Sequence, residues 1–164
     1  MADNTATRLG GNVNTAVSSN GLGGSVKALI ATIELAASAS GDTIDFGKIP
    51  SNARILNSSR IYWDDLATSG TATLDIGLKS YRNNSVTADP DALSNGHDVH
   101  SGADATDGAA LVAVNAATVG LPAWDFINGV SADPGGELEV YGTIKDAATT
   151  ATGTVTLELY YFHE

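Results

Sequence analysis

The side chains most able to do chemistry gather in one polar stretch near the middle of the chain. This stretch contains two imidazoles and several carboxylates, namely Asp89, Asp91, His97, Asp98, His100, Asp104 and Asp107. Two imidazoles with a carboxylate can hold zinc, and an oxygen-rich loop can hold calcium. However, the order Asp89, Asp91, Asn95 is not that of a calcium-binding loop, and no glutamate closes it. We therefore interpret the stretch as a solvated loop and expect no metal.

The other candidate motifs also fail on spacing. Gly41 precedes Lys48 by one residue too many for a phosphate-binding loop, and Ile49 stands where that motif needs a hydroxyl. The glycines at 21–24 are followed by a strand pattern, whereas a dinucleotide fingerprint opens a helix. Glu137 and Glu139 share one face of a predicted strand, which favours a solvated face over a catalytic carboxylate pair. Because cysteine is absent, thiol catalysis is also excluded. From these failed motifs together we expect no catalytic residue and no cofactor, and we predict that the chain is not an enzyme.

The net negative charge disfavours two classes of binding partner. The 164 residues carry 8 Lys+Arg against 19 Asp+Glu, a formal net charge of −11. Residues 1–82 are balanced, whereas residues 83–164 contain Lys145 as their single basic residue. Such a chain should not bind nucleic acid through phosphates, and an anionic membrane surface would repel it. We expect no nucleic-acid or membrane partner and, without a secretory signal pattern, synthesis in a host cytoplasm.

Period-two alternation of apolar and polar residues dominates from residue 27 onward, and this is typical of half-buried strands. Segments 28–35, 42–47, 54–63, 71–81, 137–145 and 154–163 show it and are separated by Gly, Pro, Asn and Asp clusters. They predict an all-β fold, an antiparallel β-sandwich, with a jelly roll as the expected arrangement. Residues 82–108 are predicted to form a long loop with a helical turn at 89–93, and 109–117 fits a helix or a strand equally well.

Residues 1–24 differ in composition from the rest. They are rich in glycine and asparagine and have few large aliphatic side chains. Ordering backbone costs about 1–2 kcal/mol per residue, and these side chains cannot offset that alone. We expect residues 1–24 to be an extended arm that orders against neighbouring molecules, and residues 25–164 to be the sandwich body. The residues predicted to contact the partner are Arg8, Leu9, Val13, Val17 and Leu22.

Residues 47–81 carry two elements that resemble a known family. The first is Ile49-Pro50-Ser51-Asn52-Ala53, in which Pro50 holds the chain extended while Ser51 and Asn52 can close a turn. The second is Asp75-Ile76-Gly77-Leu78, followed by an acidic segment at 89–93. This pattern resembles the head decoration, or cement, proteins of tailed bacteriophages.

The resemblance implies a structural virion protein on the outer surface of a capsid, where it cements neighbouring copies of the major capsid protein. It also implies a homo-oligomer, with a trimer as the expected form. The acidic second half agrees with a place outside the shell, because contact with packaged DNA would be repulsive. An alternative is a carbohydrate-binding β-sandwich module that stacks Trp63 or Trp124 on sugar rings.

Overall fold

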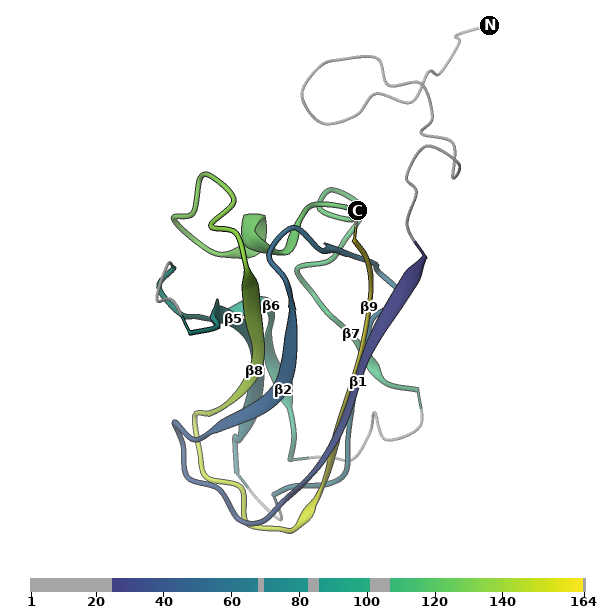
Figure 1. Cartoon of the computed structure of the whole chain (residues 1–164). Coiled ribbons are helices and arrows are strands. Elements are labelled where there is room, and N and C mark those ends of the chain that lie inside the picture. The colour runs from purple at the N-terminus through teal and green to yellow at the C-terminus, as the bar shows by residue number, and fades with distance from the viewer. Residues whose placement is uncertain (1–24, 68–69, 83–85, 101–106, 164) are drawn as a thin grey trace, which may run out of the picture.

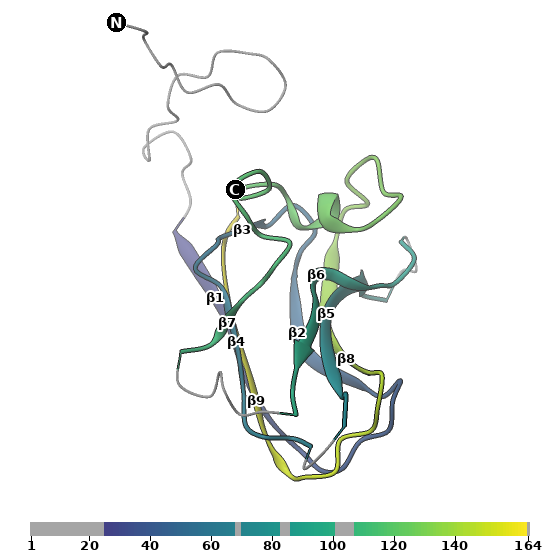
Figure 2. The same cartoon turned by 180° about the vertical axis from the view of Figure 1, so that it is seen from behind.

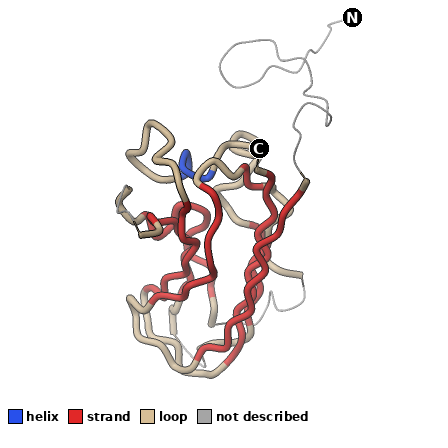
Figure 3. Tube along the Cα trace, viewed as in Figure 1, coloured by secondary structure: helices blue, strands red, loops and turns tan. Residues whose placement is uncertain are grey.

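The chain folds as a sandwich of two antiparallel sheets, as Figures 1 and 3 show for the computed structural model. The structure describes residues 25–67, 70–82, 86–100 and 107–163. Within these ranges the helical element is a short 3-10 helix, η2 (Ala123–Phe126). The prediction of an all-β antiparallel sandwich is confirmed.

The first sheet has the strand order β1-β9-β4-β7, with β3 also paired to β9. Its strands are β1 (Val26–Leu35), β3 (Arg54–Ile55), β4 (Arg60–Trp63), β7 (Ala109–Ala110) and β9 (Gly153–Phe162). β1 and β9 pair without interruption from Val26↔Phe162 to Leu35↔Gly153. The start of β1, the end of β9 and η2 therefore lie at one end of the sandwich (Figure 2).

The second sheet has the strand order β2-β8-β5-β6. Its strands are β2 (Thr43–Pro50), β5 (Thr73–Ser80), β6 (Asp89–Asp98) and β8 (Glu137–Lys145). The register of β2 shifts between Asp45 and Gly47, and the pairing of β5 with β6 shifts twice. Such bulges bend a strand and increase its twist.

The core lies between the sheets and is built from the alternating apolar positions of both. β5 contributes Leu74, Ile76 and Leu78, and β9 contributes Val155, Leu157 and Leu159, all fully buried. Because successive strand residues point to opposite faces, the same alternation leaves polar side chains outside. The face assignments expected for these two strands are thus observed.

One local prediction was wrong, and one open alternative was decided in favour of a short strand. Residues 89–93, predicted as a helical turn in a long loop at 82–108, belong to strand β6. The Asp89 carboxylate does not cap a helix but accepts a hydrogen bond from the Asn128 backbone N–H at 2.7 Å. At 109–117 the structure has the two-residue strand β7 followed by turns, and no helix.

Asp75 and Gly77 of the Asp75-Ile76-Gly77-Leu78 motif explain how β6 is held. Gly77 lies under the backbone of β6, where an added Cβ would come within 2.2 Å of the Asp89 carbonyl oxygen and 2.6 Å of Pro90 backbone atoms. The buried carboxylate of Asp75 accepts a hydrogen bond from the Gly96 N–H at 2.7 Å. The motif therefore builds the bulged pairing of β5 with β6.

The Pro50-Ser51-Asn52 turn ends β2 as expected, but its bonds differ from the predicted ones. The Ala53 N–H donates to the Pro50 carbonyl and closes the turn through the backbone. The buried Ser51 hydroxyl instead donates to Asp133 Oδ1 at 2.6 Å. Ser51 thus ties the turn to the segment before β8, whereas Asn52 is exposed.

Candidate partner-binding surface

The outer face of the β1-β9-β4-β7 sheet is the part of the described surface best suited to a protein partner. Val26 and Ile30 on β1 are 60% and 58% exposed. Ala28 and Thr32 lie on the same face because strand side chains alternate. The hydroxyls of Thr32 and Thr156 are 2.9 Å apart. Apolar and hydroxyl side chains on a flat sheet make a surface that a partner can cover at little desolvation cost.

Charged side chains on this face are few: Glu34 is exposed near the end of β1, and residues of opposite charge face each other on the neighbouring strands. Arg60 on β4 is the cross-strand partner of Glu158 on β9. Glu158 Oε2 accepts hydrogen bonds from the hydroxyls of Tyr62 and Tyr160, each at 3.3 Å. Burial, followed by the Glu158 charge, raises the pKa of Tyr62, and the Glu158 charge leads the rise in the pKa of Tyr160. Both phenols are therefore neutral donors at physiological pH.

The outer face of the other sheet is ionic. Lys48 pairs with Glu137 at 3.0 Å, and Lys79 pairs with Glu139 at 2.9 Å. The predicted solvated face of Glu137 and Glu139 is thus a row of exposed or half-exposed ion pairs. Burial, with the nearby charges of β6 and Glu139, raises the pKa of Tyr141 to about 12. Covering this face would require desolvation of several charges, which makes it the poorer docking surface.

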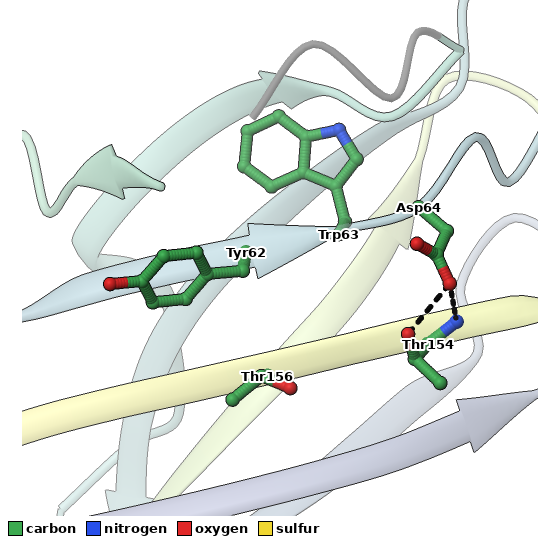
Figure 4. A pocket seen from close by; sticks show the side chains of 5 residues that line it. All are labelled: Tyr62, Trp63, Asp64, Thr154 and Thr156. Carbon is green, nitrogen blue, oxygen red and sulfur yellow. Dashed lines mark hydrogen bonds between the residues drawn. The ribbon is translucent and has the colours of Figure 1, made fainter. Parts of the chain in front are cut away.

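Two hollows on the described surface are small. One has a volume of about 190 Å³ and is lined by Asp45, Gly47, Lys48, Tyr81 and Glu139. The other, on β4 and β9, has a volume of about 90 Å³ and is lined by Tyr62, Trp63, Asp64, Thr154 and Thr156 (Figure 4). Asp64 Oδ2 accepts bonds there from the Thr154 N–H at 2.9 Å and its hydroxyl at 2.6 Å. These bonds hold the pKa of the Asp64 carboxyl below its usual value. Ligand pockets usually measure about 300–1,000 Å³, so this hollow has room for little more than water.

Of the two tryptophans proposed for sugar stacking, Trp63 is not displayed for it. Trp63 is 3% exposed, and its ring centroid lies 5.2 Å from that of His97 inside the sandwich. Trp124, in η2, is half-buried and packs against the core. Stacking on a sugar needs an open ring face, which Trp63 does not offer.

The polar stretch singled out for metal chemistry is dispersed by the fold. His97 is 8% exposed and its Nε2 lies 2.7 Å from the Ser94 hydroxyl. The His100 side chain is exposed in a turn, where the backbone N–H of His100 donates to Asp98 Oδ1. Asp104 lies outside the described residues. Within the described ranges, no three His, Asp or Glu side chains come together in a way that could hold a metal ion.

The predicted arm contacts Arg8, Leu9, Val13, Val17 and Leu22 all lie outside the described residues. Sequence reasoning missed Val26 and Ile30, although a signal was present. β1 carries apolar residues on both faces, with Leu29 and Ile33 opposite Ile30. A strand that is apolar on both faces but lies at the edge of a sheet indicates an interface.

In the described part of the chain, no helix has the length and hydropathy needed to cross a membrane.

Comparison with known proteins gives one informative likeness. Neither the profiles of known families nor the curated proteins include a match to this chain. Among solved structures, the chain is similar to a chain of the cyanophage Pam1 capsid asymmetric unit, with a TM-score of 0.56 and 20% sequence identity. The alignment covers 92% of this chain and 94% of the other. The likeness establishes a shared fold along almost the whole of both chains.

Proposed function

We propose that this protein is a structural component of a bacteriophage virion that binds the outside of the capsid and cements neighbouring major capsid subunits. The observation that carries the proposal is the shared fold, over nearly the full length of both chains, with a chain of the cyanophage Pam1 capsid asymmetric unit. A decoration role agrees with a sheet face that has exposed apolar side chains and few charges, and with motif residues that support strand pairing. The proposed role requires no catalysis and no cofactor.

The topology supports a jelly roll, an architecture common in capsid proteins. Leaving aside the two-residue β3, the strands pair as β1 with β9, β2 with β8, β4 with β7, and β5 with β6. This nested pairing is that of one long hairpin rolled into two sheets. Pairing of the first strand with the last brings residue 26 beside residue 162, so the arm leaves the body beside its C-terminal end.

Charge supports the outer surface of the shell as the location. The body carries the acidic second half of the chain, and contact with packaged DNA would be repulsive. We infer that the outer face of the β1-β9-β4-β7 sheet meets the major capsid protein, while the ionic face of β2-β8-β5-β6 points to solvent. Arm residues 1–24 extend the contact, and a trimer is the oligomer that we propose.

Binding to purified empty heads of the virus that encodes the protein tests this function. The intact chain should cosediment with heads, and a variant lacking residues 2–24 should lose binding while keeping its unfolding transition. Ile30→Glu places a charge among the exposed apolar side chains of β1 and should weaken binding. Val119→Glu, at a loop position that is 42% exposed, is the matched control and should bind normally. Normal occupancy by both Ile30→Glu and the arm deletion would contradict the proposal.

A further inference from the structure

Among the described residues, four strands lie at the edges of the two sheets, and three of them are blunted. β7 has two residues. β2 has a bulge after Asp45 and ends at Pro50, and β6 has two register shifts and contains Pro90. Short length, bulges and proline are the usual devices that stop an edge from pairing with another strand. β1, at the open side of its sheet in Figure 1, has none of them, and its ten residues pair with β9 in unbroken register.

The edge of β1 is also uncovered within the described part of the chain, where β9 is the strand that pairs with it. On the inner face Leu29 and Ile33, which point toward the core, remain half-exposed. On the outer face Ile30 is 58% exposed. The charged residues of the strand, Lys27 and Glu34, lie near its two ends. A regular edge with open apolar side chains and an uncharged middle is a template for another strand.

A second copy of β1 fits this edge because the strand is self-complementary in antiparallel register. Two identical edges pair about a two-fold axis, and directly opposed side chains then lie on the same face of the joined sheet. With the axis at Ala31, Leu29 of each copy stands opposite Ile33 of the other. The half-exposed apolar side chains of the inner face then cover one another. On the outer face Ile30 stands opposite Thr32, and at the axis the small Ala31 meets its own equivalent.

The charges of β1 agree with antiparallel self-pairing. Like charges of the two copies are at least six positions apart, or about 20 Å at 3.3 Å per residue. Lys27 of one copy instead lies diagonal to Glu34 of the other, one position along the strand. Like charges directly opposite one another destabilise a sheet, and this register opposes none. An axis at Ile30 fits less well than one at Ala31, because it would set Lys27 against the apolar Ile33 on the inner face.

We propose that β1 pairs with β1 of a second copy as an antiparallel edge contact centred on Ala31, which joins two β1-β9-β4-β7 sheets into one continuous sheet. The contact uses the edge, so the outer faces of both copies stay open side by side. A single strand edge is a smaller contact than the roughly 1,200–2,000 Å² of a stable interface, so association of the free protein is weak. One consequence rests on the proposed function: copies held on a shell are at high effective concentration, and this two-fold contact, which closes after two copies, then ties copies of different trimers together.

Disulfide trapping at the axis tests the pairing in the free protein, and the absence of native cysteine makes the background clean. Opposed Cα atoms in an antiparallel pair lie about 4.5–5.5 Å apart, which suits a disulfide. Ala31→Cys should therefore form a covalent dimer under mild oxidation, at a rate that rises with protein concentration. The matched control is Ala28→Cys. Ala28 is more exposed than Ala31, but its Cα would lie about 20 Å from its equivalent in the second copy.

Ala28→Cys should cross-link at least about tenfold more slowly than Ala31→Cys, despite its greater exposure. Equal rates, or a faster rate for Ala28→Cys, would overturn the pairing, because they would indicate random encounters. A faster rate for Ile30→Cys than for Ala31→Cys would overturn the register.

Lysine substitutions give a second readout, self-association measured by sedimentation equilibrium. Ala31→Lys brings two ammonium groups together at the axis and should weaken self-association by about tenfold or more. Ala28→Lys faces Glu34 of the second copy and should leave self-association equal or stronger. Equal weakening by both variants would overturn the pairing. Melting curves check that both fold, and if Ala31→Lys does not, the cross-linking rates decide alone.

The consequence for the shell is tested with Ala31→Cys on empty heads, where the covalent dimer should form faster than in solution at the same total concentration. Bound protein that does not cross-link would overturn this consequence and leave the proposed function in place. Cross-linking in solution without any binding to heads, by the variant or the intact chain, would contradict the proposed function and leave the pairing in place.

Discussion

Gly77→Ala tests the link between the Asp75-Ile76-Gly77-Leu78 motif and the bulged strand β6. The new Cβ would lie 2.2 Å from the Asp89 carbonyl oxygen and 2.6 Å from Pro90 backbone carbons. Comfortable contacts are about 3.5 Å, so β6 must move by about 1 Å. That movement disturbs the bond from the Asn128 N–H to the Asp89 carboxylate. Overpacking of this kind against backbone costs about 3 kcal/mol when a hydrogen bond is also weakened.

The assay is thermal or urea unfolding of the purified protein, with Gly142→Ala as the matched control. In a chain of this size, a loss of about 3 kcal/mol corresponds to a fall of about 6–12 °C in Tm. Gly142 is on the adjacent strand β8, where a Cβ would meet the ends of the Leu74 and Phe46 side chains at 3.0 Å. Those ends can move, so the control should lose about 1 kcal/mol. An equal or smaller loss for Gly77→Ala would refute the account of the motif.

Three further predictions concern titration and packing. Burial raises the pKa of Tyr141 from 10.0 to about 12, so the unfolded chain loses the phenol proton at a lower pH than the folded chain does. The free energy of unfolding should therefore fall by about 1–2 kcal/mol between pH 10 and 12. Tyr141→Phe should remove that fall in urea titrations. His97→Ala opens a cavity beside the core and should lower the free energy of unfolding by about 2–3 kcal/mol. His100→Ala, at an exposed position, should change it by under about 0.5 kcal/mol. A chelator should alter the melting curve of neither variant. The pKa of the Asp64 carboxyl is lowered in the folded chain. Its contribution to the free energy of unfolding is therefore present above the pKa of the unfolded chain and is lost as the pH falls. In acid-unfolding curves, Asp64→Asn should cost about 1 kcal/mol near pH 7 and less below about pH 4.

The strands with regular alternation were predictable because their local pattern and their tertiary environment agree. β5 and β9 have apolar residues at every second position, and the structure buries those positions. β6 was not predictable, because Leu78 pairs with Asp89 while Ile76 pairs with Ser94. A step of two positions along β5 thus matches a step of five along β6, and the extra residues erase the period of two. The resulting bulge depends on Gly77 of another strand, a dependence that no local pattern contains.

The candidate surface was only partly predictable. The apolar residues on both faces of β1 were visible in the sequence, but their meaning depends on where the strand lies in the sheet. In a central strand Ile30 would be core, whereas at an edge it is 58% exposed and available to a partner. Trp63 alternates with Ile61 in the sequence, and both are buried. The burial of His97 could not be predicted from its local sequence, since its contact with Trp63 follows from β4 and β6 facing each other across the sandwich.

Electron cryo-microscopy of heads assembled with and without the protein tests the central claim most directly. We predict additional density on the outer surface of the shell that bridges neighbouring major capsid subunits, with the β1-β9-β4-β7 sheet toward the shell and the ionic face of β2-β8-β5-β6 toward solvent. Density on the inner, DNA-facing surface, or no difference between the two reconstructions at saturating protein, would contradict the account.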